Sequence, residues 1–141
     1  NFMGYQNRPG IFKVRGVEVE ANWSLKNWNI NTNYTFTEKV GQAPLRLPKH
    51  AANIGLNYAA PKTQWGLHWR YIGKRYDVNQ AFTQEKLDAY ALVDARIAFP
   101  NFIGNTTASL AVTNVFDVEY TEIFGFTTLG RNLNIALRYA F

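Results

Sequence analysis

The chain ends in a segment in which apolar and polar residues alternate without a break. Leu133, Ile135, Leu137, Tyr139 and Phe141 alternate with polar or small residues. Successive side chains of a β-strand point to opposite faces, so this segment would carry one continuously apolar face that closes on an aromatic carboxy-terminal residue. The last strand of a transmembrane β-barrel needs this pattern, because it presents apolar groups to lipid while it pairs with the first strand. We therefore interpret it as the closing strand of a transmembrane β-barrel.

Six further segments show similar alternation, so the fold class predicted is all-β, with about seven long antiparallel strands. The expected strands are residues 14–25, 28–37, 50–59, 64–75, 88–99, 106–115 and the closing segment. Strands of soluble proteins average roughly five or six residues, whereas a strand that crosses a bilayer needs roughly nine to eleven. No segment approaches the roughly 18 consecutive apolar residues of a transmembrane helix. The lengths favour a membrane-spanning sheet.

The connections between these strands alternate between short and long. The short ones are residues 26–27, 60–63 and 100–105, and the long ones are residues 38–49, 76–87 and 116–129. Outer-membrane barrels have short periplasmic turns and long extracellular loops. Counting back from a carboxy terminus in the periplasm places every short turn there, which supports the assignment.

Aromatic residues form two bands along the expected strands. One band lies toward the short turns and contains Trp23, Trp28, Tyr58, Trp65, Phe99, Tyr139 and Phe141, whereas Tyr34, Phe36 and Tyr71 lie toward the long loops. Amphipathic rings prefer the depth of lipid headgroups, so two bands predict two interfacial girdles. A soluble sandwich or a lipocalin-like barrel with an aromatic core is the alternative, because alternation does not say which face points inward.

Composition restricts the possible functions. The chain has no cysteine, which excludes disulfides and thiolate metal sites, and its net charge of +5 comes from scattered Lys and Arg rather than a basic run, which argues against nucleic-acid binding. The two histidines, His50 and His68, have no spacing that suggests a metal cage, and we expect no cofactor. The first ten residues contain neither an initiator Met nor an export signal, so we expect a piece of a longer chain.

One constellation could support nucleophilic catalysis. His68 and Asp94 are expected on one face of adjacent strands, and Ser109 lies one strand further. The simpler interpretation, which we favour, is a network of paired charges formed by His68, Arg70, Asp94 and Arg96. Similarly, Asn114 and Asp117 are expected to cap the sixth strand and start a turn, because their side chains readily bond nearby backbone.

The carboxy-terminal part of the chain carries the clearest family resemblance. The segment Asn114-Val-Phe-Asp-Val-Glu-Tyr120, then Gly130-Arg131, then Tyr139-Ala-Phe141, resembles the end of TonB-dependent outer-membrane receptors. Further similar segments are residues 15–20 (a Gly-aliphatic-Glu strand), 47–50 (a Pro-containing loop exit) and 90–94. One departure is Ala136, where the assembly signal of barrel proteins commonly has Gly. The motifs occur in the family's order over essentially the whole chain.

The resemblance implies a barrel of about 22 strands with an amino-terminal plug that binds TonB. It also implies import of a nutrient, and the nutrient that we expect first is a ferric siderophore. Residues 1–141 would then be the carboxy-terminal part of the barrel, without the plug and the first strands. Such a segment has two open edges, which hydrocarbon does not tolerate, so alone it should not transport anything. A passive pore or structural barrel formed by oligomerisation is the alternative, and a barrel-type hydrolase a more remote one.

The resemblance also suggests where partners bind. Ligand recognition in this family lies on the outer loops and the plug, which makes Phe82, Phe124, Phe126 and Arg131 the candidate ligand-binding residues, since rings with an Arg suit catechol or carboxylate groups. Tyr139 and Phe141 are the candidates for recognition by the barrel-assembly machinery. The other expected partners are outer-membrane lipid and, through the plug of the parent protein, TonB.

Overall fold

The structure is a computed structural model that describes residues 13–40 and 45–141. These residues form strands joined by turns and loops, and they include no helix long and apolar enough to cross a membrane. The strands are β1 (Lys13–Leu25), β2 (Trp28–Val40), β3 (His50–Ala59), β4 (Gln64–Ile72), β5 (Arg75–Val78), β6 (Gln84–Leu87), β7 (Tyr90–Ile103), β8 (Thr106–Thr113) and β9 (Asn132–Tyr139).

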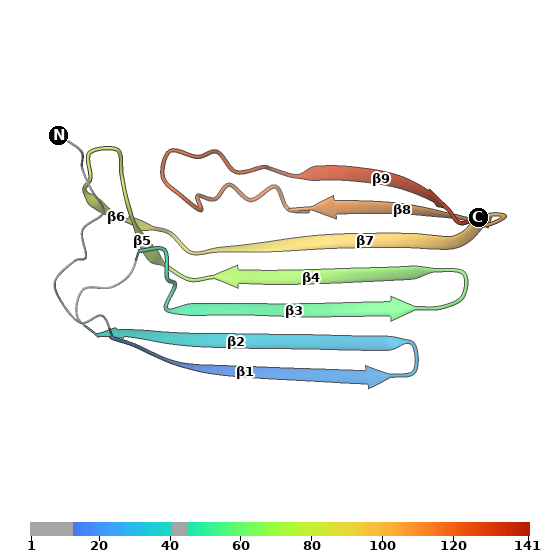
Figure 1. The fold of residues 1–141 in the computed structure, drawn as a ribbon, viewed down its shortest axis with the longest axis horizontal. Coiled ribbons are helices and arrows are strands. Elements are labelled where there is room, and N and C mark those ends of the chain that lie inside the picture. Colours follow the sequence, from blue (N-terminus) through green and yellow to red (C-terminus); the bar gives the residue numbers. More distant parts are fainter. Residues whose placement is uncertain (1–12, 41–44) are drawn as a thin grey trace.

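Seven of these strands form one antiparallel sheet in the order β1-β2-β3-β4-β7-β8-β9, and β5 pairs with β6 in a separate hairpin. Each strand of the large sheet therefore lies beside its neighbour in sequence, apart from the inserted hairpin. The tight turns and the carboxy terminus gather at one end of the sheet, and the long connections with the β5–β6 hairpin lie at the other (Figure 1). This arrangement confirms the predicted sheet and its alternation of short and long connections.

The register aligns side chains of one kind across the whole sheet. One row of directly opposed residues is Leu25, Trp28, Tyr58, Trp65, Ile97, Leu110 and Ile135. The row beside it, on the opposite face, is Ser24, Asn29, Asn57, Gly66, Arg96, Ala111 and Asn134. We call these the apolar face and the polar face of the sheet.

The apolar face is not a core. Leu25 is 69% exposed and Ile135 is 73% exposed. Among the residues that the structure describes, the buried hydrophobic side chains are Leu87, Tyr90, Leu92 and Ala98. A water-soluble sandwich would have to bury its apolar rows, because each exposed large side chain forgoes about 1.5–3 kcal/mol of transfer free energy. The open apolar face fits a sheet whose outer surface meets lipid.

The polar face is held together by amide side chains. Asn53 Nδ2 donates to Asn33 Oδ1 at 2.9 Å across β2 and β3, and Asn29 Nδ2 donates to Ser24 Oγ at 2.9 Å across β1 and β2. The side chain of Asn31 lies directly over Gly55, where a Cβ atom would overlap Asn31 Oδ1. Glycine at position 55 thus makes room for an amide on the neighbouring strand.

The two expected aromatic bands are present on the apolar face. At the short-turn end, Trp28 lies 5.0 Å from both Tyr58 and Trp65 between ring centroids. At the long-loop end, Trp69 stacks on Tyr71 at 6.1 Å, and the Tyr34 hydroxyl lies 2.7 Å from His50 Nδ1. The packed rings mark both margins of the apolar face.

Several predicted boundaries were wrong. The fourth strand ends at Ile72 rather than residue 75, because Arg75 already belongs to the hairpin β5–β6. The rest of this hairpin lies in residues 76–87, which were predicted to be a long loop. The fifth predicted strand, residues 88–99, corresponds to β7. This strand continues through Pro100 to Ile103, and the register shifts between Phe99 and Ile103. A bulge accommodates a proline, which has no N–H to donate to a ladder, so Pro100 does not end the strand. The strand β8 ends at Thr113, which leaves Asn114 and Val115 outside it.

Candidate ligand-binding site

The hairpin β5–β6 carries a buried carboxylate that ties three segments together. Asp77 is fully buried, and its Oδ1 accepts hydrogen bonds from Arg46 Nε at 2.8 Å and from the Val78 amide at 2.9 Å. Its Oδ2 accepts one from the Phe124 amide at 3.0 Å. Asp77 thereby joins the hairpin to the β2–β3 connection and to the segment that links β8 and β9, residues 114–131, which we call the final loop.

The contacts of Asp77 favour its ionised form. Burial alone raises the pKa of this carboxyl group, but the hydrogen bonds from the Phe124 amide, the Arg46 side chain and the Val78 amide, together with the charge of Arg46, outweigh it. The pKa of Asp77 is therefore lowered from its ordinary value, because each donor stabilises the anion. The carboxylate is a charged anchor, held by donors from three parts of the chain.

A second anchor lies on the same face of the hairpin. Buried Arg75 donates from one guanidinium nitrogen to the carbonyl oxygens of Thr121 and Glu122, at 2.7 and 3.3 Å. Its guanidinium carbon lies 5.2 Å from the centroid of the Tyr90 ring, a cation–π arrangement. Arg75 thus clamps the final loop against the start of β7.

Tyr90 completes this attachment. Its hydroxyl donates to Glu122 Oε1 at 2.9 Å, and its ring packs against that of Tyr120 with centroids 4.5 Å apart. The hairpin, the start of β7 and the final loop therefore form one packed unit, which we call the loop platform, at the long-loop end of the sheet (Figure 1).

The final loop leaves β8 through a turn built by two polar residues. Asn114 has a φ of 51°, and its side chain both accepts from the Val118 amide at 2.9 Å and donates to the Val118 carbonyl at 3.0 Å. Asp117 Oδ1 accepts from the Arg131 amide at 2.7 Å, which brings the two ends of the loop together. The expected capping and turn roles of Asn114 and Asp117 are confirmed.

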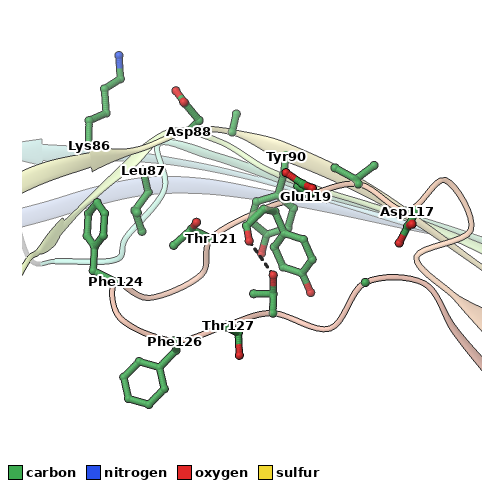
Figure 2. A pocket seen from close by; sticks show the side chains of 15 residues that line it. Lys86, Leu87, Asp88, Tyr90, Asp117, Glu119, Thr121, Phe124, Phe126 and Thr127 are labelled. Atoms are coloured by element: carbon green, nitrogen blue, oxygen red, sulfur yellow. Dashed lines mark hydrogen bonds between the residues drawn. The ribbon is translucent and has the colours of Figure 1, made fainter.

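A cavity of about 800 Å³ lies against the loop platform. Figure 2 shows it between the end of β6, the start of β7 and the final loop, with Phe124 and Phe126 on its wall. Three acidic residues, Asp88, Asp117 and Glu119, and one basic residue, Lys86, also line it. Aromatic rings, hydroxyls and carboxylates in one cavity can contact a ligand that combines aromatic and hydrogen-bonding groups.

The structure brings together only part of the predicted ligand set. Phe124 and Phe126 line the cavity, and Phe126 is 72% exposed. Phe82 lies at the tip of the hairpin, 91% exposed, and is not in the cavity wall. Arg131 is exposed beside Gly130, which does line the cavity, and its described contact is the backbone bond to Asp117. The ligand-binding role of these four residues stays a prediction.

Sequence reasoning missed the residues that hold the cavity in place. Arg75 ends the predicted strand 64–75, and Asp77 lies within the predicted long loop of residues 76–87. Neither belongs to an alternating apolar pattern, so periodicity gives no signal for them. A weak signal exists at Asn79, whose side-chain oxygen accepts from the Ala81 and Thr83 amides at 2.9 Å each, as asparagine often does at a hairpin turn.

The polar face does not bring together His68, Asp94 and Ser109, the three residues considered for nucleophilic catalysis. His68 lies opposite Asp94 in the register, with His68 Nδ1 at 4.0 Å from Asp94 Oδ2, as expected. Ser109 lies opposite Ala98, four residues along β7 from Asp94, or about 13 Å. Asp94 Oδ1 instead accepts from the Asn114 amide at 2.8 Å. In the described part of the chain, no group of three or more His, Asp or Glu side chains is close enough to hold a metal ion.

The predicted assembly residues lie at the short-turn end of the last strand. Tyr139 is 60% exposed and packs edge-on against Phe141, with ring centroids 5.5 Å apart. Both rings are accessible beside the free edge of β9. Recognition of this edge by the assembly machinery remains a prediction.

An open antiparallel sheet of long strands, with one apolar face exposed between two aromatic bands, is the wall of a membrane β-barrel. Residues 2–115 match the family model of the TonB dependent receptor-like β-barrel, and the chain belongs to this family. TonB-dependent receptor barrels are outer-membrane proteins of Gram-negative bacteria, and the family is one of transporters.

Solved structures agree with this assignment. The siderophore receptor PiuA from Acinetobacter baumannii superposes with a TM-score of 0.74 at 21% identity, over 91% of this chain and 22% of PiuA. The ferripyoverdine receptor of the Pseudomonas aeruginosa outer membrane was solved with ferripyoverdine bound. It superposes with a TM-score of 0.72 at 26% identity, over 91% of this chain and 19% of that receptor. A chain of the FpvAI–pyocin S2 complex superposes with a TM-score of 0.75 at 26% identity, over 91% of this chain and 20% of that one. The chain thus spans about a fifth of the length of the receptors that it matches.

Proposed function

We propose that residues 1–141 form the carboxy-terminal part of the barrel of a TonB-dependent receptor that imports a ferric siderophore. The observation that carries the proposal is the sheet itself, whose apolar face runs unbroken through all seven strands, in a chain that belongs to this receptor family. The similarity at 26% identity to a receptor that binds ferripyoverdine supports the choice of substrate class. The plug, the first strands and the contact with TonB belong to the rest of the receptor.

In this proposal the loop platform contributes to the outer binding site. The long connections face the outside, so the 800 Å³ cavity opens where a ligand arrives. Phe124 and Phe126 offer rings for stacking, while the threonines and carboxylates accept or donate hydrogen bonds. Phe82 and Arg131 are exposed outside the cavity wall, where they would contact a ligand larger than the cavity.

The remaining partners follow from the two faces of the sheet. The apolar face contacts outer-membrane lipid, the polar face lines the lumen, and the free edge of β9 with Tyr139 and Phe141 is presented to the barrel-assembly machinery. The receptor reaches TonB through its plug.

Ferric siderophore uptake tests the proposal at the cavity. Phe126→Ala in the receptor that carries this chain should raise the KM for uptake about fivefold, because a stacked ring contributes roughly 1 kcal/mol to ligand contact. Phe116→Ala is the matched control, since Phe116 is also 72% exposed in the final loop but lies outside the cavity wall. Equal uptake by both variants and the unaltered receptor would exclude a ligand-contact role for Phe126.

A second function is favoured by one feature, the two unpaired edges of the described sheet at β1 and β9. Unpaired backbone groups are costly in hydrocarbon, so copies of the chain could pair edge to edge and close a passive pore. Ion conductance of the purified chain in planar bilayers would support this pore. A silent bilayer after confirmed insertion would end it.

A further inference from the structure

A second cavity, of about 540 Å³, lies at the long-loop end of the sheet. Four of the seven lysines of the chain line it: Lys39, Lys49, Lys74 and Lys86. Only one acidic residue, Glu38, shares the wall. We call it the lysine pocket. Its residues come from the end of β2, the start of β3, the end of β4 and the hairpin, so the sheet gathers charges that are scattered along the sequence.

The rings of the lysine pocket lie on the apolar side of the sheet, whereas Thr37 and Lys39 occupy the β2 positions that alternate with Phe36. Two of its rings, His50 and Tyr71, pair with Phe36 and Ala52 within the rows of the apolar face. Tyr76 and Lys86 oppose each other on the hairpin and alternate with Arg75 and Asp77, whose side chains are buried in the loop platform. The pocket therefore lies on the other side of the hairpin from the Asp77 contacts.

Three of the pocket lysines, Lys49, Lys74 and Lys86, form no ion pair with the carboxylates of the described residues. Among residues 13–40 and 45–141, the ion pairs are Arg46–Asp77 and His68–Asp94, so no carboxylate lies within 4.0 Å of the Lys49, Lys74 or Lys86 nitrogens. All three residues are exposed. Lys49 Nζ lies 5.6 Å from the Phe36 ring centroid, which directs this cation over the apolar face.

An apolar strip continues from the pocket along the same face. Tyr71 stacks on Trp69, and Trp69 lies opposite Ile54, which is 45% exposed. A ligand held by the lysines would thus have hydrocarbon-compatible surface directly beside its charged group. Cations at headgroup depth, with rings and aliphatic side chains at the depth of the acyl chains, match the layered chemistry of an anionic lipid.

We propose that the lysine pocket binds the phosphate-bearing headgroup of an outer-leaflet lipid, whose acyl chains lie along the Tyr71–Trp69–Ile54 strip. The proposal rests on the proposed function only for the orientation, which places the long loops outside. Basic pockets on membrane proteins hold lipid phosphates in this way, and lysine acts as a point charge toward phosphate. The lysine pocket is distinct from the 800 Å³ cavity at the loop platform, which we call the siderophore cavity, and shares only Lys86 with it.

Native mass spectrometry of the purified receptor that carries this chain tests the proposal, with bisphosphorylated lipid A as the probe. The variant Lys49→Gln/Lys74→Gln should bind this lipid roughly 25-fold more weakly, because each lysine near lipid phosphate contributes about a factor of five. The matched control is Lys26→Gln/Lys62→Gln, which removes the same charge from the two short turns and should leave binding unchanged. Dephosphorylated lipid A should bind the unaltered receptor as weakly as bisphosphorylated lipid A binds the Lys49/Lys74 variant.

Three results would overturn the proposal: equal losses in the two double variants, equal binding of dephosphorylated lipid A, or displacement of the lipid by inorganic phosphate at similar concentration. The last would mark a site for soluble phosphate. Siderophore uptake keeps this test separate from the proposed function, since Lys49 and Lys74 lie outside the siderophore cavity and their variant should import normally. Failure of uptake in the unaltered receptor would count against the proposed function and not against the lipid site.

Discussion

At the scale of single residues, the loop platform depends most on the buried carboxylate of Asp77. It accepts hydrogen bonds from Arg46, Val78 and Phe124, which come from three different segments. Hydrogen bonds to a charged group contribute roughly 1.5–3 kcal/mol each, and a lost acceptor leaves buried donors unpaired. Together with the bonds from Arg75 to Thr121 and Glu122, this side chain holds the final loop to the hairpin.

Asp77→Asn should loosen the loop platform. We expect hydrogen exchange of peptides that contain Val78 and Phe124 to become about 100-fold faster at neutral pH, which corresponds to about 3 kcal/mol of lost protection. Because the pKa of Asp77 is lowered in the folded protein, its stabilisation is complete above the ordinary carboxyl pKa of about 3.9 and is lost as the pH falls through the lowered value.

The pH dependence of exchange separates this role from a general loss of structure. Protection in the unaltered protein, corrected for intrinsic rates, should fall in the acid range, whereas the Asp77→Asn variant should show no such step. Glu119→Gln, which removes an exposed carboxylate from the final loop, is the control and should behave like the unaltered protein. A step that persists in Asp77→Asn would assign the titration to another group.

Asn114 is the second residue on which the loop geometry rests. Its φ of 51° and its two side-chain bonds to Val118 both favour asparagine. Asn114→Ala should destabilise the final loop by about 2–3 kcal/mol, because it loses these bonds and places alanine in the left-handed region. Asn114→Gly avoids the backbone strain but still loses the two side-chain bonds, so its loss of loop stability should be about 1 kcal/mol smaller than that of Asn114→Ala. Protease cleavage of the final loop measures both losses. Equal cleavage of both variants would show that backbone strain contributes nothing.

At the scale of strands, the sheet was predictable because its stabilising pattern is local. Alternation in each strand specifies its apolar face, and the register joins these faces into rows such as the one from Leu25 to Ile135. The hairpin β5–β6 was missed because its strands of four residues show no apolar period, and two of their three buried members, Arg75 and Asp77, are charged while only Leu87 is apolar. The cavity beside it depends on long-range polar contacts, for which the sequence has no periodic signal.

The two faces of a strand should respond differently to the same charge. Leu67 and His68 are neighbours in the middle of β4, on the apolar and polar faces respectively. Leu67→Arg should cost the folded receptor about 2–4 kcal/mol in lipid vesicles, as expected for a cation at the depth of the bilayer centre, whereas His68→Arg should cost less than about 1 kcal/mol. Urea unfolding followed by heat-modifiable gel mobility measures both. If His68→Arg were the more costly change, the lipid-facing surface would be the polar one.

At the scale of the whole molecule, the described sheet is a wall with two edges rather than a closed barrel. The receptors it resembles are about five times longer, which agrees with a segment that closes only with further strands. Two cavities at its long-loop end lie on opposite sides of the hairpin, one toward the proposed siderophore path and one toward lipid. The hairpin thus supports two surfaces with different chemistry.

The orientation of this wall in the outer membrane is the central claim, and single-cysteine labelling on intact cells tests it most directly, since the chain has no cysteine of its own. In the receptor that carries this chain, Phe82→Cys at the hairpin tip should react with a membrane-impermeant maleimide. Lys62→Cys, in the short turn between β3 and β4, should react only after the outer membrane is opened. Labelling of Lys62→Cys but not Phe82→Cys on intact cells would contradict the account.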